Sequence, residues 1–80
     1  MTYLDAIIMA LKNLGGTGKY KDIYKEYSKI TNRQLTDGIK AGIRKTIEDY
    51  SSDSQNFKGI DIFYSVEGLG KGIWGIRDIK

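Results

Sequence analysis

The chain of 80 residues contains no cysteine and no histidine. Without cysteine it can form neither a disulfide nor a thiolate metal site, which is typical of proteins in a reducing compartment. Without histidine it also lacks the commonest general base of enzymes and a usual zinc ligand. We therefore expect a non-catalytic domain with no cofactor and no bound metal.

Long apolar runs are also missing. No segment approaches the roughly 20 apolar residues that span a bilayer. Asp5 interrupts the first apolar run and no basic stretch precedes it, so the sequence does not indicate a signal peptide. Hydrophobic residues still make up 40% of the chain, which is ample for a folded domain. We expect one cytoplasmic domain covering residues 1–80, associated with the nucleoid if the source is bacterial. The end of the chain soon after Ile76 fits a domain boundary, so we also expect a longer parent protein.

Charge of either sign is moderate. Lysine and arginine together number 13 and the acidic residues 10, which gives a net charge of +3. Such an excess permits binding to a polyanion without requiring it, so the placement of the cations matters more than their sum. The carboxylates are scattered beside lysines, as on solvated helix faces. Asp49 and Asp53 bracket a serine-rich loop, but a divalent ion there is much the weaker interpretation.

The first predicted element is a helix from Thr2 to Leu14. Thr2 is a suitable N-cap, with Asp5 three residues later, and Gly15-Gly16 is a typical helix stop. The apolar residues follow the spacing of one buried helical stripe: Leu4, Ile7, Ile8, Leu11 and Leu14. The residues 17–19 that follow are expected to form an extended linker or a minimal strand.

A second amphipathic helix is predicted to begin near Tyr20 and to end between Ser28 and Ile30. Its apolar stripe is rich in tyrosine: Tyr20, Ile23, Tyr24, Tyr27 and Ile30. A tyrosine stripe can stack on nucleic-acid bases, but aromatics at helical spacing more often pack in a core. We favour the core interpretation.

A third helix is predicted from an N-cap at Thr36 to about Tyr50. The residues of its expected inner face are Ile39, Ile43, Thr46, Ile47 and Tyr50, and those of its outer face are Asp37, Lys40, Ala41, Arg44, Lys45 and Glu48. Gly38 and Gly42 each weaken a helix by about 1 kcal/mol relative to alanine, which suggests a close approach at these positions. A neighbouring helix is favoured over a DNA backbone as the approaching element.

The last third of the chain predicts a β-hairpin. The apolar runs 61–66 and 73–77 are joined by the glycine-rich turn 67–72. Alternation places Tyr64 and Val66 on one face, with Trp74 and Ile76 as the matching pair, although Phe63 competes for burial. Serine hydroxyls of the polar loop 51–56 are expected to cap the third helix rather than to bind phosphate. The whole pattern predicts a mainly α fold with a small β wing: a winged helix-turn-helix of three helices and a two- or three-stranded antiparallel sheet.

Two glycine patterns match phosphate-binding motifs only by letter. Residues 70–75 read G-x-G-x-x-G, but such a site needs a strand before and a helix after, and the chain ends too soon. Residues 15–19 resemble the end of a phosphate loop, but Tyr20 stands where Ser or Thr would bind magnesium. We reject both.

The remaining candidate for chemistry is a basic helix beside a basic wing. In helix-turn-helix proteins the second helix of the motif lies in the major groove, where arginine can bind guanine and lysine can neutralise phosphate. Lys71 lies at the tip of the predicted hairpin, where a wing would meet the DNA backbone. The predicted DNA-binding residues are Thr36, Lys40, Ala41, Arg44, Lys45 and Lys71.

The chain also resembles the HARE-HTH type of winged helix, a domain joined to restriction endonucleases. The resemblance is carried by residues 3–11, by the Gly-Gly and 19–23 that open the second helix, by Thr36 and 43–47, and by Phe63, Val66, Gly72, Trp74 and Ile76. It implies a target-recognition or adaptor domain for double-stranded DNA in a restriction-type or regulatory protein. Any nuclease activity would then lie in another domain or subunit. A related domain occurs in a bacterial RNA polymerase subunit, so docking on a polymerase or a partner protein is the alternative.

Overall fold

The computed structural model describes residues 2–55, 57–67 and 72–77. They form three helices and a three-stranded antiparallel sheet, and none of the described helices is long and apolar enough to cross a bilayer. In chain order the elements are α1 (Tyr3–Asn13), β1 (Thr17–Lys19), α2 (Tyr20–Thr31), α3 (Asp37–Asp49), β2 (Phe63–Ser65) and β3 (Ile73–Ile76). The predicted fold class is confirmed: a small, mainly α domain with a β-hairpin, in an arrangement compatible with a winged helix.

Helix α1 begins and ends where the sequence predicts. The Thr2 hydroxyl accepts a hydrogen bond of 3.1 Å from the Asp5 amide. At the other end the Gly16 amide donates to the Leu11 carbonyl at 2.8 Å, while Gly15 and Gly16 have φ angles of 88° and 103°. This is a Schellman motif, which requires the positive φ that glycine adopts without strain.

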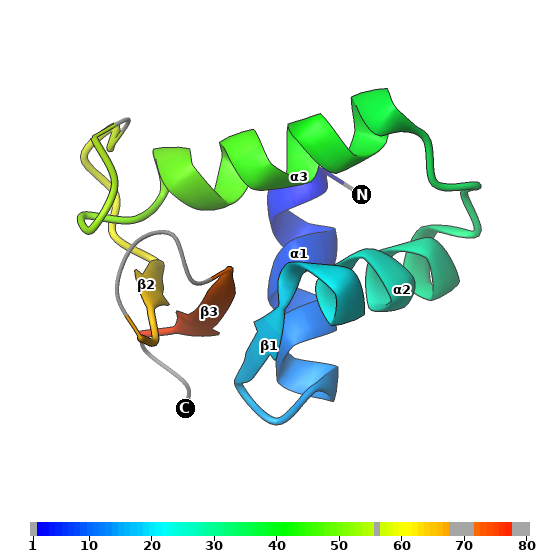
Figure 1. The fold of residues 1–80 in the computed structure, drawn as a ribbon, viewed down its shortest axis with the longest axis horizontal. Helices are drawn as coiled ribbons and strands as arrows, with labels where there is room; N and C mark the ends of the chain where they lie inside the picture. Colours follow the sequence, from blue (N-terminus) through cyan, green and yellow to red (C-terminus); the bar gives the residue numbers. More distant parts are fainter. Residues whose placement is uncertain (1, 56, 68–71, 78–80) are drawn as a thin grey trace.

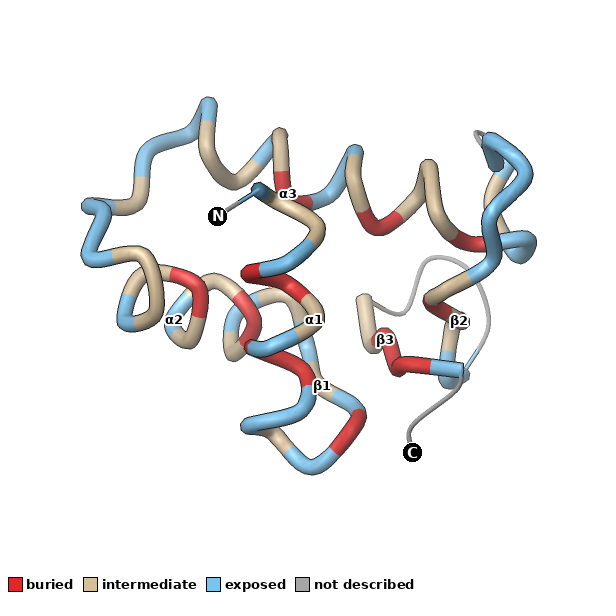
Figure 2. Tube along the Cα trace, turned by 180° about the vertical axis from the view of Figure 1, so that it is seen from behind, coloured by how far each residue is buried: buried red, intermediate tan, exposed pale blue. Residues whose placement is uncertain are grey.

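The core lies where α1 meets the other two helices and the sheet (Figures 1 and 2). The fully buried apolar residues of the three helices are Ala6, Ile7, Ala10, Leu11, Ile23, Ile43 and Ile47. Of the five residues predicted as the stripe of α1, Ile7 and Leu11 are fully buried, whereas Leu4, Ile8 and Leu14 are partly buried and pack against the core. Helix α1 packs against both α2 and α3, and its fully buried residues combine two small alanines with Ile7 and Leu11.

Helix α2 follows β1 directly and ends slightly later than predicted. Its last residue is Thr31, and Asn32 adopts a left-handed conformation with φ of 55°, which asparagine tolerates better than most residues. Tyr27 is buried, as the core interpretation of the tyrosine stripe expects, whereas Tyr20 and Tyr24 are only half-buried. The chain then crosses to α3 through the short segment 32–36.

The sheet places β3 between β1 and β2. Phe63 pairs with Ile76 and Ser65 with Trp74. Residues directly opposite one another share a face of the sheet, so Phe63 joins Trp74 and Ile76 in the core. The prediction that Tyr64 and Val66 form the inner face is wrong, because this register turns Phe63 inward, where it is fully buried, and leaves Val66 38% exposed.

The passage between α3 and β2 folds back onto the end of α3. The Lys58 amide donates to the Asp49 carbonyl at 2.9 Å, and the amides of Ile62 and Phe63 both donate to the Tyr50 carbonyl. The hydroxyl of buried Ser51 accepts from the Asp53 amide. The Ser51 hydroxyl therefore bonds to the backbone within the passage itself. These bonds fix the position of the hairpin relative to α3.

Candidate nucleic-acid interface

Helix α3 separates into an inner and an outer face, but Lys40, which was predicted on the outer face, does not lie there. Ile43 and Ile47 are fully buried against the rest of the domain. Ala41, Arg44 and Lys45 are exposed, and Lys40 is half-buried. Arg44 and Lys45 are thus the exposed cations of α3, while Lys40 lies on the side of the helix that faces α2.

The two candidate residues that lie outside α3 are Thr36 and Lys71, and the structure describes only the first. The Thr36 side chain is exposed, and its hydroxyl accepts from the Ile39 amide at 3.1 Å, so it caps α3 as predicted. A capping hydroxyl fixes the start of the helix and retains a lone pair toward solvent. Lys71 lies outside the described residues.

Lys45 makes a surface ion pair. Its Nζ lies 2.8 Å from the Asp49 carboxylate one turn later, while the Lys45 side chain remains 71% exposed. The Asp49 side chain, by contrast, is only 16% exposed. The Lys45 ammonium is therefore accessible to solvent while it remains paired with a largely buried carboxylate.

Arg44 and Lys40 converge on one residue of α2, Tyr24. The Arg44 Nη1 donates a hydrogen bond of 2.9 Å to the Tyr24 hydroxyl. The Lys40 Nζ lies 5.8 Å from the centre of the Tyr24 ring, within the range of a cation–π interaction. From the sequence we assigned Tyr24 to the core and missed this role. The only sequence signal for it is that Tyr24 lies at one edge of the tyrosine-rich stripe of the second helix.

Tyr24 is the outer end of an aromatic bridge, which we define as Tyr20, Tyr24 and Trp74. The Tyr20 and Tyr24 rings are stacked, with centroids 5.9 Å apart and an interplanar angle of 16°. Tyr20 also contacts Trp74 of β3 at a centroid distance of 6.3 Å, and its amide donates to the Gly72 carbonyl at 3.0 Å. The bridge therefore connects the cations of α3 to the strand that ends the hairpin.

The electrostatics around the aromatic bridge keep Tyr20 neutral and the neighbouring Arg44 charged. Burial raises the pKa of Tyr20 to about 12, with a further contribution from the negative charge of Glu48. The hydrogen bond with Tyr24 raises the pKa of Arg44 above its ordinary value, and Glu48 acts in the same direction.

The structure explains why one of the two glycines of α3, Gly42, is a glycine. A Cβ atom there would lie 2.7 Å from the ring of Tyr3, so only glycine lets α1 and α3 approach this closely. The prediction of a neighbouring helix is confirmed at this position. At Gly38 the nearest atom to such a Cβ is the Thr36 hydroxyl at 3.8 Å, so no helix approaches there.

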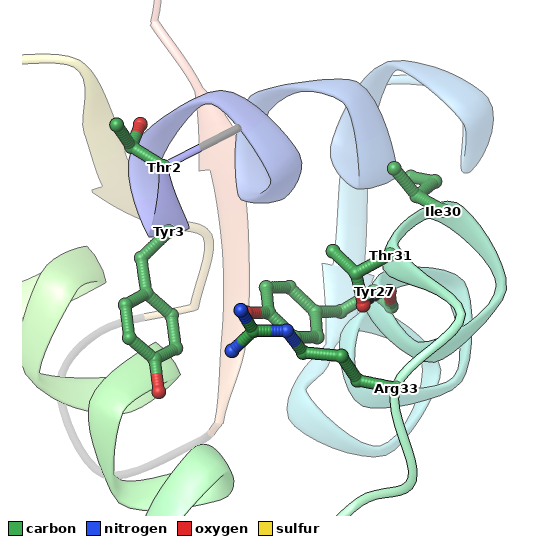
Figure 3. A pocket seen from close by; sticks show the side chains of 6 residues that line it. All are labelled: Thr2, Tyr3, Tyr27, Ile30, Thr31 and Arg33. Carbon is green, nitrogen blue, oxygen red and sulfur yellow. Dashed lines mark hydrogen bonds between the residues drawn. The ribbon is translucent and has the colours of Figure 1, made fainter.

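A concavity lies between the start of α1 and the end of α2, as Figure 3 shows. It has a volume of about 540 Å³ and is lined by Thr2, Tyr3, Tyr27, Ile30, Thr31 and Arg33. The hydroxyls of Thr2 and Thr31 are already used, by the Asp5 amide and the Tyr27 carbonyl. Burial raises the pKa of Tyr27, so its hydroxyl stays protonated. Among its lining side chains only Arg33 carries a charge.

The carboxylates do not form a metal site in the described part of the chain. No group of three or more potential ligands occurs there. Asp53 accepts instead from the Ser65 amide at 2.8 Å and lies 3.2 Å from the Arg77 guanidinium. The Asp53 carboxylate thus links the passage after α3 to the ends of both strands of the hairpin, at Ser65 and Arg77.

Comparison of the chain with protein-family models, with curated proteins and with solved structures found no match. The geometry and chemistry of the chain itself therefore carry the functional argument.

Proposed function

We propose that this domain binds double-stranded DNA, with α3 in the major groove and the hairpin as a wing against the backbone. The observation that carries the proposal is the pair of exposed cations Arg44 and Lys45 on α3, with the half-buried Lys40 one turn before Arg44, beside Tyr24 of α2. An α-helix fits the major groove, and cations on its outer face meet both phosphates and base edges there.

The fold supports this proposal because Ala41, Arg44 and Lys45 of α3 are exposed. The helix contacts α1 and α2, and the strands of the hairpin lie near its C-terminal end (Figure 1). A helix and a hairpin that are exposed side by side can contact successive parts of one duplex. In this proposal Thr36 and Ala41 contribute at the start and middle of α3, and Lys71 contributes from the wing.

The wider setting follows from the resemblance to HARE-HTH domains. We propose that the domain serves as a non-catalytic recognition or adaptor module of a restriction-type or regulatory protein, in the cytoplasm. Cleavage of DNA would then belong to a nuclease domain elsewhere in the same protein or in another subunit.

The proposal is tested by titrating labelled duplex DNA with the protein at several salt concentrations. The logarithm of the affinity should fall linearly with the logarithm of the salt concentration, with a slope of about −0.9 for each phosphate neutralised. The double substitution Lys40→Ala/Arg44→Ala should weaken binding and make the slope shallower.

A matched control removes the same charge from another face. Lys12 lies in the last turn of α1, and Lys29 pairs with Glu26, whose other oxygen accepts from Asn13 of α1. The substitution Lys12→Ala/Lys29→Ala therefore changes the net charge equally without touching α3. Equal loss of affinity in both double variants would mean that only net charge matters and that α3 does not bind DNA.

One observation favours the alternative of protein docking. Ile60 is 61% exposed and Phe57 38% exposed, and both lie in the passage that leads into β2. Met9 on α1 is also exposed, whereas Leu69 lies outside the described residues. Aspartate substitutions at Phe57 and Ile60 should leave DNA binding intact if α3 is the interface, and should abolish partner binding if docking is the function.

A further inference from the structure

Tyr24 holds one edge of the Arg44 guanidinium and leaves the other side accessible. The hydrogen bond to the Tyr24 hydroxyl uses Nη1 at 2.9 Å. An arginine side chain has further N–H donors on Nε and Nη2, arranged in a planar fork. Because Arg44 is exposed, that second edge can donate to a ligand while the first stays bound to tyrosine.

The tyrosine is itself held firmly. Its ring stacks on Tyr20 at 5.9 Å, and Tyr20 is fixed by the Gly72 carbonyl and by contact with Trp74. The Lys40 ammonium lies over the Tyr24 ring. A surface arginine normally loses rotamer entropy when it binds, so a fixed partner lowers that cost and restricts the direction of the guanidinium.

We propose that Tyr24 is a positioning residue for base recognition, and that it orients Arg44 to bind the O6 and N7 atoms of a guanine in the major groove. The ligand class follows from the chemistry, because the planar fork of arginine matches these two acceptors and no other base edge as well. The inference rests on the proposed function, since it needs α3 to lie in that groove.

The test begins with selection of preferred duplexes from a random library by the wild-type protein. The selected guanines are then replaced one at a time by 7-deazaguanine, which removes the N7 acceptor. We expect about a tenfold or larger loss of wild-type affinity at one position. Tyr24→Phe keeps the ring and its stacking but lacks the hydroxyl, and should lose most of that discrimination while its salt slope stays unchanged.

The outcomes are distinguishable. If the wild type binds no duplex at any salt concentration, the proposed function fails and this inference fails with it. If the wild type binds and Tyr24→Phe discriminates against 7-deazaguanine equally well, the positioning role is wrong while DNA binding stands. If Arg44→Ala makes the salt slope shallower and 7-deazaguanine has no effect on the wild type, Arg44 binds phosphate and guanine recognition is overturned.

Circular dichroism of each variant verifies that it is folded, and the nuclear magnetic resonance signal of the Arg44 guanidinium in the free protein should sharpen in Tyr24→Phe as the side chain becomes mobile.

Discussion

The Arg77 Nε donates to the Asp61 carboxylate at 2.8 Å and to the Phe63 carbonyl at 3.0 Å. This pair joins the end of β3 to the passage that precedes β2. Ser52 completes the junction, because its amide and its hydroxyl both donate to Asp61. The hairpin is thus attached to the end of α3 by the Asp61 carboxylate, which accepts hydrogen bonds from Ser52 and from Arg77.

The first prediction concerns acid stability. The Ser52 amide, followed by its hydroxyl and by Arg77, lowers the pKa of Asp61 below its ordinary value of 3.8. A depressed pKa adds stability that is complete above the ordinary pKa and disappears as the pH falls through the folded value. Acid titrations followed by circular dichroism should show a steeper loss of the free energy of unfolding in the wild type than in Asp61→Asn. Identical acid limbs would show that Asp61 does not hold the junction.

The second prediction concerns alkaline pH. Since burial raises the pKa of Tyr20 from 10.0 to about 12, the unfolded chain ionises this tyrosine first. The unfolded state then binds fewer protons, so the free energy of unfolding should fall as the pH rises between these two values. For a half-buried ring the loss should be about 1 kcal/mol, discounted for solvent. Denaturant melts of Tyr20→Phe should lack this part of the decline, and an unchanged decline in the variant would assign it to other tyrosines.

The third prediction uses the two glycines of α3 as a matched pair. Gly38→Ala makes only an ordinary contact with the Thr36 hydroxyl at 3.8 Å and should stabilise the protein by up to about 1 kcal/mol through helix propensity. Gly42→Ala must displace the Tyr3 ring, which stacks on Tyr27 at 5.6 Å. It should therefore be at least about 1 kcal/mol less stable than Gly38→Ala. Urea melts of both variants decide this, and equal stabilities would contradict the close contact of α1 with α3.

The fourth prediction tests the register of the hairpin. Phe63→Ala should destabilise the domain by about 3–5 kcal/mol because it empties a fully buried site. Val66→Ala should cost no more than about 0.5 kcal/mol, because Val66 is already partly in solvent. The opposite order in thermal melts would restore the register in which Tyr64 and Val66 face inward.

The sequence predicted those features that depend on neighbouring residues. Thr2 and Thr36 as N-caps, and the helix stop at Gly15, are recognisable because each signal acts within one helical turn. The inward face of α3 was also predictable from the period of its isoleucines. Local rules are sufficient for such elements.

Features that depend on the packing of distant elements were not predictable. Phe63 and Tyr64 are adjacent aromatics, so alternation alone cannot say which one faces inward; the pairing of Phe63 with Ile76 decides it. The bond between Arg44 and Tyr24 spans 20 positions along the chain. It exists only because α2 and α3 lie beside each other, which no local pattern encodes.

The central claim is that duplex DNA lies against the outer face of α3, and its most direct test is nuclear magnetic resonance mapping. Isotopically labelled protein is titrated with duplex DNA, and the shift of each backbone amide is followed. We predict that the largest shifts occur between Thr36 and Lys45 and in the strands of the hairpin, while the exposed side of α1 around Met9 stays unchanged. Shifts concentrated around Met9, or none anywhere, would contradict the account.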